Sequence, residues 1–101
     1  MSFVTTTSAD SIVIGVPVRF DFSLMRYFRS TVEEAVHRHP GNEIVVDLAK
    51  TNYLDSAALG MLLVLRDHAR RGGKSVVLSR ATGAVRSSLD VANFGKLFEF
   101  R

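Results

Sequence analysis

The stretch Ile44-Val-Val-Asp-Leu-Ala-Lys-Thr-Asn-Tyr-Leu-Asp-Ser-Ala-Ala-Leu-Gly60 decides the fold of this chain. Its first five residues are an apolar, β-branched run, which predicts a central strand buried on both faces. Its last residues open a long apolar helix, which we expect to begin at Ala57 with Ser56 as its N-cap. A buried strand followed by a helix is typical of an α/β sheet.

Ser56 is the first candidate functional residue. A serine at a helix N-terminus lies among unpaired backbone N–H groups and at the positive end of the helix dipole, where an added anion is favourable. Most serines in this position are caps and nothing more, and that alternative stays open for Ser56. However, Leu54 and the run Ala57, Ala58 and Leu59 make the junction unusually apolar for a surface loop. We therefore predict that Ser56 can carry a phosphate within an exposed apolar docking patch.

The segments around this stretch predict alternating strands and helices. Two runs rich in Val, Ile and Thr, separated by Ser8-Ala-Asp10, predict an opening antiparallel hairpin, and Asp21 or Ser23 can cap the helix that follows. Strands are expected at residues 3–7, 11–18, 44–48, 75–79 and 96–100, and helices at residues 23–39, 57–71 and 83–91, the last with Thr82 as its cap. This order is typical of right-handed crossover units on one sheet.

Composition indicates one intracellular domain. A chain of 101 residues that is 47% hydrophobic and 23% charged can bury a core of its own. It has no cysteine, which excludes a disulfide framework or a thiolate site and agrees with a reducing compartment. No apolar run approaches the roughly eighteen residues that span a bilayer, and the first residues do not resemble a signal peptide. We therefore expect a cytoplasmic protein without membrane insertion.

The charge pattern does not favour nucleic acid or metal as a ligand. The net charge is +3, and the cations concentrate in the second half of the chain, at Arg66, Arg70, Arg71, Lys74, Arg80 and Arg86. No aromatic residue interleaves this cluster, so we predict no binding of nucleic acid. His37 and His39 could be considered as a metal-binding pair, but residues two apart in a helix do not face each other. We predict no metal site.

Enzymatic activity is also not predicted. A hydrolase could be built from Ser56 and His68, but these residues lie twelve apart on one expected helix, about 18 Å at 1.5 Å per residue. No G-x-S-x-G elbow surrounds the serine. Glycine-rich nucleotide-binding motifs are absent as well, so we expect neither catalysis nor a cofactor.

A family resemblance adds to these predictions. The strand at 44–48, the segment Tyr53-Leu-Asp-Ser-Ala-Ala-Leu-Gly60, the leucine-rich helix ended by Gly72-Gly73 and the strand Ser75-Val-Val-Leu-Ser79 resemble the STAS domain of bacterial anti-sigma factor antagonists. Asn93-Phe-Gly-Lys-Leu-Phe98 is similar to the closing strand region of that family. The resemblance implies an α/β fold with a mixed sheet of four to five strands and helices mainly on one face. It also implies a single domain over residues 1–101 that lacks the last helix of longer members.

The resemblance further implies a phosphorylation switch. Unmodified, such a domain binds an anti-sigma factor, often itself a GHKL-type serine kinase, and thereby frees a sigma factor. Phosphorylation of the serine, here Ser56, releases the partner, and a PP2C-type phosphatase restores binding. The partner-binding residues carried over to this chain are Asp21, Asp55, Ser56, Ala57, Ala58 and Leu59. Ala58 stands where family members often have glycine.

Three alternatives stay open at this point. STAS-like subunits also serve as non-catalytic partners in lipid-transport ABC complexes, where Ser56 would be an interface residue without phosphate turnover. Asp55 holds its loop through backbone hydrogen bonds, orients the Ser56 hydroxyl for a kinase, or combines the two roles, and the mixed role is our interpretation. Asp47 is interpreted as a buried hydrogen-bonding residue near the loop. In either function we expect a monomer or weak dimer.

Overall fold

The computed structural model describes residues 3–101, and its elements follow the predicted alternation of strands and helices. The elements are β1 (Val4–Thr7), β2 (Ser11–Gly15), β3 (Arg19–Phe20), η1 (Phe22–Leu24), α1 (Met25–Glu33), η2 (Glu34–Arg38), β4 (Glu43–Asp47), β5 (Tyr53–Leu54), α2 (Ser56–Arg71), β6 (Ser75–Ser79), α3 (Gly83–Val91), η3 (Phe94–Lys96) and β7 (Glu99–Phe100). None of the helices within residues 3–101 combines the length and apolar character needed to cross a membrane.

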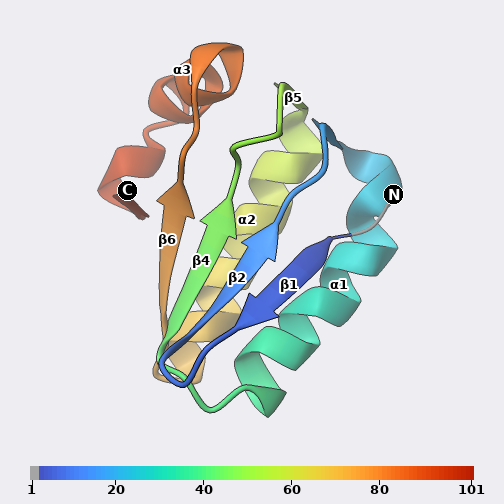
Figure 1. Cartoon of the computed structure of the whole chain (residues 1–101). Coiled ribbons are helices and arrows are strands. Elements are labelled where there is room, and N and C mark those ends of the chain that lie inside the picture. The colour runs from blue at the N-terminus through green and yellow to red at the C-terminus, as the bar shows by residue number, and fades with distance from the viewer. Residues whose placement is uncertain (1–2) are drawn as a thin grey trace.

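A mixed five-stranded sheet with the order β1-β2-β4-β6-β7 forms the centre of the molecule. The opening hairpin of β1 and β2 is antiparallel as predicted, and β2, β4, β6 and β7 are parallel. Helices α1 and α2 lie side by side behind the sheet, whereas α3 lies beyond the end of β6 (Figure 1). The predicted α/β fold, with a mixed sheet and helices mainly on one face, is therefore confirmed.

The central strand β4 is buried on one face only. Ile44 and Val46 point toward the helices and are fully buried, while Val45 and Asp47 on the other face are half-buried. The prediction that this strand is buried on both faces is wrong, because no helix formed by residues 3–101 covers the outer face of the sheet (Figure 1). Valine has a high strand propensity whether its face is covered or open, so the β-branched run does not distinguish the two.

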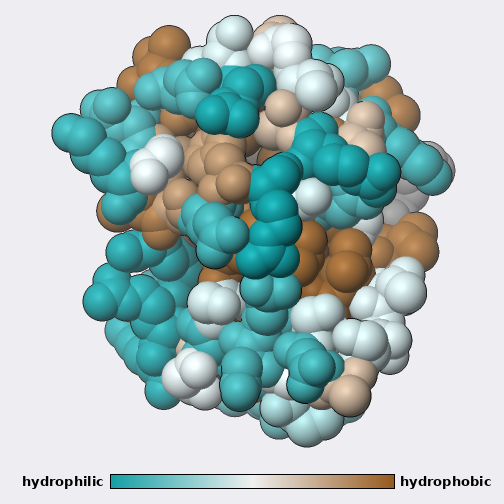
Figure 2. Space-filling view, turned by 60° about the vertical axis from the view of Figure 1, so that its left-hand side comes forward, coloured by the Kyte–Doolittle hydropathy of each residue, from teal (hydrophilic) through white to brown (hydrophobic). Residues whose placement is uncertain are grey.

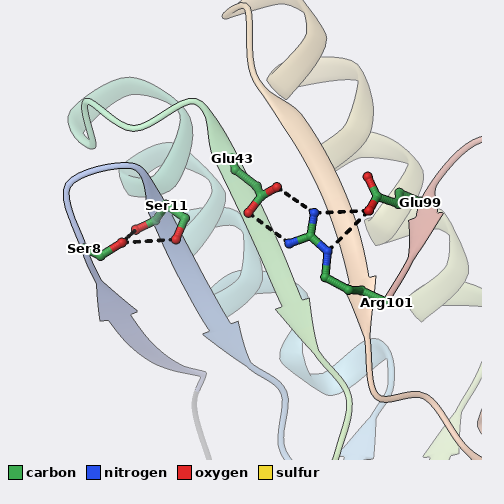
Figure 3. A network of polar contacts seen from close by, with 5 residues as sticks. All are labelled: Ser8, Ser11, Glu43, Glu99 and Arg101. Atoms are coloured by element: carbon green, nitrogen blue, oxygen red, sulfur yellow. Dashed lines mark hydrogen bonds and ion pairs between the residues drawn. The ribbon is translucent and has the colours of Figure 1, made fainter.

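An ion-pair network covers part of the outer face. The Arg101 guanidinium donates to both carboxylate oxygens of Glu43 on β4, at 3.1 and 2.9 Å, and to Glu99 on β7, at 3.1 and 3.3 Å. The side chain crosses β6 to do so (Figure 3), and Val77, on that face of β6, is only 1% exposed. The hydrogen bonds from Arg101 lower the pKa of Glu43. Seen from the side that carries α3 and the C-terminal segment, hydrophilic side chains separate the apolar areas of the surface (Figure 2).

Three phenylalanine rings pack together in the part of the core next to β3 and the loop that follows it. Phe20 contacts Phe3 at 5.7 Å and Phe28 at 5.5 Å between ring centroids, and Phe3 and Phe28 are 5.2 Å apart. Phe20 is fully buried and belongs to β3, directly before Asp21. Burial of this ring therefore fixes the start of the loop that carries Asp21.

The first helix differs from its prediction at both ends. It begins with the 3-10 turn η1, whose N-cap is Asp21, since the Asp21 carboxylate accepts a hydrogen bond from the Ser23 N–H. It ends in the π-helical turn η2 rather than as a regular α-helix. The two ring nitrogens of His39 are both engaged after this turn, one by the Gly41 N–H and the other at 3.0 Å from the Ser8 carbonyl oxygen.

The predicted final strand is shorter than expected. Residues 94–96 form the 3-10 helix η3, and only Glu99 and Phe100 pair with β6. The interpretation of residues 93–98 as a strand region is wrong, because Phe94 and Phe98 stack with centroids 5.2 Å apart. In an extended strand, residues four apart are separated by about 13 Å, so the turn is what allows the two rings to meet in the core.

Candidate functional site

A short parallel pairing of β3 with β5 joins two loops that are far apart in the sequence. Arg19 pairs with Tyr53 and Phe20 with Leu54, so that Asp21 and Asp55 both leave this pairing at the same end. The Asp55 N–H also donates to the Phe20 carbonyl oxygen at 3.3 Å. The candidate residues Asp21, Asp55 and Ser56 are therefore brought together.

Asp55 holds the two loops through its carboxylate. One oxygen accepts the Ala58 N–H in the first turn of α2 at 2.9 Å, and the other accepts the Phe22 N–H at the start of η1 at 3.1 Å. Asp55 is thus the N-cap of α2, and the prediction that Ser56 caps this helix is wrong. Aspartate is as good an N-cap as serine, and here its second oxygen also provides an acceptor for the Phe22 N–H in the other loop. Of the two roles considered for Asp55, the structure shows the loop-holding one.

Ser56 is the first residue of α2 and is exposed to solvent. Its position beside the cap places the hydroxyl next to helix N–H groups that have no acceptor within the helix. An added phosphate would meet these groups and the positive end of the helix dipole, but it would also lie close to the Asp55 carboxylate. Ser56 is therefore accessible to a modifying enzyme, and a phosphate there would be attracted by the helix N-terminus and repelled by Asp55.

The apolar rim predicted around Ser56 is only partly exposed. Ala58 is fully buried in the free domain, so its side chain is not part of the exposed rim, and its contact with a partner stays a prediction. Leu54, Ala57 and Leu59 are half-buried and pack against the core. The reason is the helical period, since Ala58 lies on the same stripe of α2 as the buried residues three and four positions further along.

Two aromatic residues that the sequence analysis did not single out form the exposed apolar surface of the site. Phe22 is 66% exposed and directly follows Asp21, while Tyr53 is 41% exposed and precedes Asp55 by two positions. The guanidinium carbon of Arg19 lies 4.2 Å from the centroid of the Tyr53 ring. The sequence feature that could have identified them is the position of both aromatic residues close to the candidate acidic residues Asp21 and Asp55.

Asp21 adds a second carboxylate to the site. It accepts hydrogen bonds from the Ser23 N–H at 3.0 Å and the Ser23 hydroxyl at 2.6 Å, and Arg19 Nε lies 3.4 Å away. The bond from the Ser23 hydroxyl is the main cause that lowers the pKa of Asp21, so the group is ionised at neutral pH. Asp21 and Asp55 thus place two carboxylates near Ser56, and the Arg19 guanidinium offsets part of their charge.

A comparison with known proteins assigns the family. A family model described as "Mlab, STAS domain" matches residues 4–99. The chain belongs to the STAS domain family. The STAS-domain containing protein PA14_20770 of Pseudomonas aeruginosa (strain UCBPP-PA14) is 39% identical over 101 residues, which cover 98% of each chain.

Solved STAS structures share the fold at low sequence identity. The anti-sigma factor antagonist SpoIIAA in its unphosphorylated form has a TM-score of 0.77 at 16% identity, covering 99% of this chain and 87% of that chain. The phosphorylated form of SpoIIAA from Bacillus has a TM-score of 0.76 at 14% identity, with 99% and 91% covered. An anti-sigma-factor antagonist (STAS) domain protein from Planctomyces limnophilus has a TM-score of 0.85 at 15% identity, with 99% and 89% covered. These likenesses support the STAS fold.

The STAS domain also carries an ion pair at the end of β4. Arg80 donates to both oxygens of Asp47, at 2.6 and 3.1 Å, and the Ala49 N–H donates to the same carboxylate at 3.0 Å. Asp47 is half-buried on the outer face of the sheet rather than enclosed in the interior as interpreted from the sequence. The hydrogen bonds from Arg80 lower the pKa of Asp47.

Acid is expected to weaken the folded STAS domain in part through Asp47. Because the folded pKa is lower than the ordinary value of 3.8, the stabilisation is complete above that value and is lost as the pH falls through the folded pKa. Asp47→Asn should therefore unfold at a lower urea concentration than the wild type at about pH 7, and the difference should disappear at about pH 2. Urea titrations at both pH values measure this, and a difference that does not change with pH would contradict it.

Proposed function

We propose that this STAS domain is an anti-sigma factor antagonist that is switched by phosphorylation of Ser56. In its unmodified form it binds an anti-sigma factor with GHKL-type serine kinase activity in the cytoplasm and thereby frees a sigma factor. Phosphorylation of Ser56 releases the partner, and a PP2C-type phosphatase reverses the modification. The domain itself is a binding protein without catalytic activity. The observation that carries the proposal is the exposed Ser56 hydroxyl at the start of α2, beside the Asp55 cap and the exposed rings of Phe22 and Tyr53.

Charge explains why such a modification would act on binding and spare the fold. A phosphate adds about −1.5 to −2 charges and three acceptor oxygens. In the free domain, the group remains in water at a helix N-terminus, where repulsion from Asp55 is screened and partly offset by the helix dipole. In a complex, the same dianion would lose water beside Asp21 and Asp55, and an uncompensated buried charge costs several kcal/mol. Since about 1.4 kcal/mol is tenfold in affinity, this is enough to dissociate a regulatory complex.

The family supports this proposal and also a second one. SpoIIAA, which shares the fold, is known in an unphosphorylated and a phosphorylated form. The description of the matching family model, however, names Mlab. The second candidate is therefore a non-catalytic subunit of a lipid-transport ABC complex. In that function the site around Ser56 would contact a transporter subunit, and the hydroxyl would stay unmodified.

Ser56→Asp is expected to weaken binding of the anti-sigma factor at least about tenfold, because it places a permanent charge at the interface. The melting temperature should change by no more than a few degrees, since the substituted side chain is exposed. Ser75→Asp is the matched control, because Ser75 is exposed at the start of β6, beyond the C-terminal end of α2, and the substitution adds the same charge at the opposite end of that helix from Ser56. Titration calorimetry with the purified anti-sigma factor measures the affinities.

Two further measurements separate the candidates. Ser56→Ala should bind the anti-sigma factor as the wild type does but accept no phosphate from the kinase. Mass spectrometry of the protein from its native cells should find phosphate on Ser56 under at least one growth condition. Equal affinity of wild type and Ser56→Asp would refute the switch, and a Ser56 that is never phosphorylated would favour the transport subunit.

A further inference from the structure

A largely apolar groove of about 650 Å³ runs between α1 and α2 on the side of the molecule away from the sheet. The α1 wall is formed by Met25, Phe28 and Val32, and the α2 wall by Gly60, Met61 and Val64. Val64 is 52% exposed, so the groove is open to solvent along this wall. Ala57 lines its end, directly next to Ser56. The groove is therefore continuous with the surface that the proposed function assigns to the partner.

Gly60 leaves open space on the α2 side of this groove. It lies inside α2, where glycine costs about 1 kcal/mol relative to alanine. A Cβ atom built on Gly60 meets nothing within 4 Å, so no contact within the domain requires the absence of a side chain. Glycine commonly occurs where the backbone must be approached closely by a ligand. Gly60 therefore leaves a position on the α2 wall of the groove without a side chain, which gives a partner backbone room to approach.

The charges beside the groove indicate an acidic partner. Arg29 lines the α1 wall, and Arg26 lies one turn before it on the same helix. Within residues 3–101 neither guanidinium takes part in an ion pair. Glu33 also lines the groove, but it is the last residue of α1 and lies at the end away from Ser56, with its carboxylate 3.9 Å from His37. The unpaired positive charge is therefore at the end of the groove near Ser56. Cations beside an apolar groove favour a ligand with apolar residues facing the groove and carboxylates on its flank.

We infer that the groove binds an amphipathic helix of the partner protein, with an acidic flank facing Arg26 and Arg29. A helix presents its apolar residues at positions i, i+3, i+4 and i+7, which matches a groove between two neighbouring helices. The inference rests on the proposed function and deepens it, because it gives a reason why phosphorylation weakens partner binding. A phosphate on Ser56 stands at the end of the groove and repels an acidic helix.

Synthetic peptides test the groove without the partner protein. The probe is an 18-residue helical peptide with leucines at i, i+3, i+4 and i+7 and glutamates on the flank, and its counterpart carries lysines in place of the glutamates. Fluorescence anisotropy should show the glutamate peptide binding at least about tenfold tighter than the lysine peptide. Gly60→Phe should weaken binding of the glutamate peptide at least about tenfold, because the ring fills the groove. Gly95→Phe is the matched control, because Gly95 is also exposed with nothing within 4 Å of its built Cβ, and it should bind as the wild type does.

Arg29→Glu gives a second readout that does not depend on filling space. It should reverse the preference, so that the lysine peptide binds more tightly than the glutamate peptide. The inference is overturned if neither peptide binds, if Gly60→Phe binds as tightly as Gly95→Phe, or if Arg29→Glu leaves the preference unchanged. A wild-type dimer in sedimentation equilibrium that Gly60→Phe abolishes would assign the groove to a second copy of the chain and would also overturn the inference.

Failure of the groove and failure of the switch give different results. If Ser56→Asp releases the anti-sigma factor while Gly60→Phe binds the glutamate peptide normally, the groove inference fails and the proposed function stands. If the Gly60 and Arg29 variants act as expected while Ser56→Asp keeps full affinity for the anti-sigma factor, the groove stands and the switch fails.

Discussion

Phe20→Ala is expected to lower the free energy of unfolding by about 3–5 kcal/mol, the range observed when a buried aromatic ring is removed from a core. Phe20 is fully buried and contacts both Phe3 and Phe28, so its loss leaves a cavity that two other rings line. Since 1 kcal/mol shifts the melting temperature of a domain of this size by about 4–8 °C, the midpoint should fall by more than about 10 °C. Calorimetry and urea unfolding measure the loss.

Phe22→Ala is the matched control for this substitution. Phe22 is the same residue type two positions away, but it is 66% exposed, so its removal should change the free energy of unfolding by no more than about 0.5 kcal/mol. The same variant removes an exposed ring of the proposed partner surface, and we expect it to weaken partner binding. Equal destabilisation by the two substitutions would show that the Phe20 ring is not the support of this region.

Asp55→Ala is expected to destabilise the domain by about 2 kcal/mol, because it removes the cap of α2 and a second hydrogen bond in one step. The carboxylate bonds to the N–H groups of Ala58 and Phe22, so both amides lose their partner. Asp55→Asn retains one acceptor oxygen and should cost about half as much. Urea unfolding measures the stability, and hydrogen exchange at Phe22 and Ala58 reports the opening of the two loops.

Asp67→Ala provides the comparison for Asp55→Ala. Asp67 is an exposed carboxylate on α2 that lies 3.0 Å from Arg71, and such surface pairs contribute little, about 0.5 kcal/mol or less. If Asp55→Ala is as stable as Asp67→Ala, the carboxylate of Asp55 does not join the loops. If hydrogen exchange is faster at Ala58 but unchanged at Phe22, only the helix cap depends on Asp55.

The larger elements could be predicted because their sequence patterns are strong and local. The strand at residues 75–79 has the predicted bounds, since a β-branched run follows the Gly72-Gly73 helix end. The strands β3 and β5 have two residues each, which is too short for a period to be detected. The choice of Asp55 over Ser56 as the cap could not be predicted either, because both residue types are good caps. The Asp55 carboxylate also accepts the Phe22 N–H, a contact between residues far apart in the sequence.

The candidate site was predicted in part. Ser56 was predicted from its place at the start of a helix, the family resemblance added Asp21 and Asp55 as partner-binding residues, and the structure brings the three together through β3 and β5. Exposure depends on tertiary neighbours, so the sequence did not distinguish the exposed rings of Phe22 and Tyr53 from core residues. Phosphorylation of Ser56 stays a prediction, as does contact with a partner for all of the residues assigned to that surface, which are Asp21, Asp55, Ser56, Ala57, Ala58 and Leu59.

The pairing of β3 with β5 has a kinetic consequence for signalling. Because the two loops are already fastened together in the free domain, by that pairing and by Asp55, the surface is preorganised and docking needs no slow rearrangement. Association should then proceed at the about 10⁵–10⁷ M⁻¹ s⁻¹ typical of preformed surfaces. Under the proposed function, turnover of the kinase and the phosphatase, and not docking of the domain, would then limit the response time.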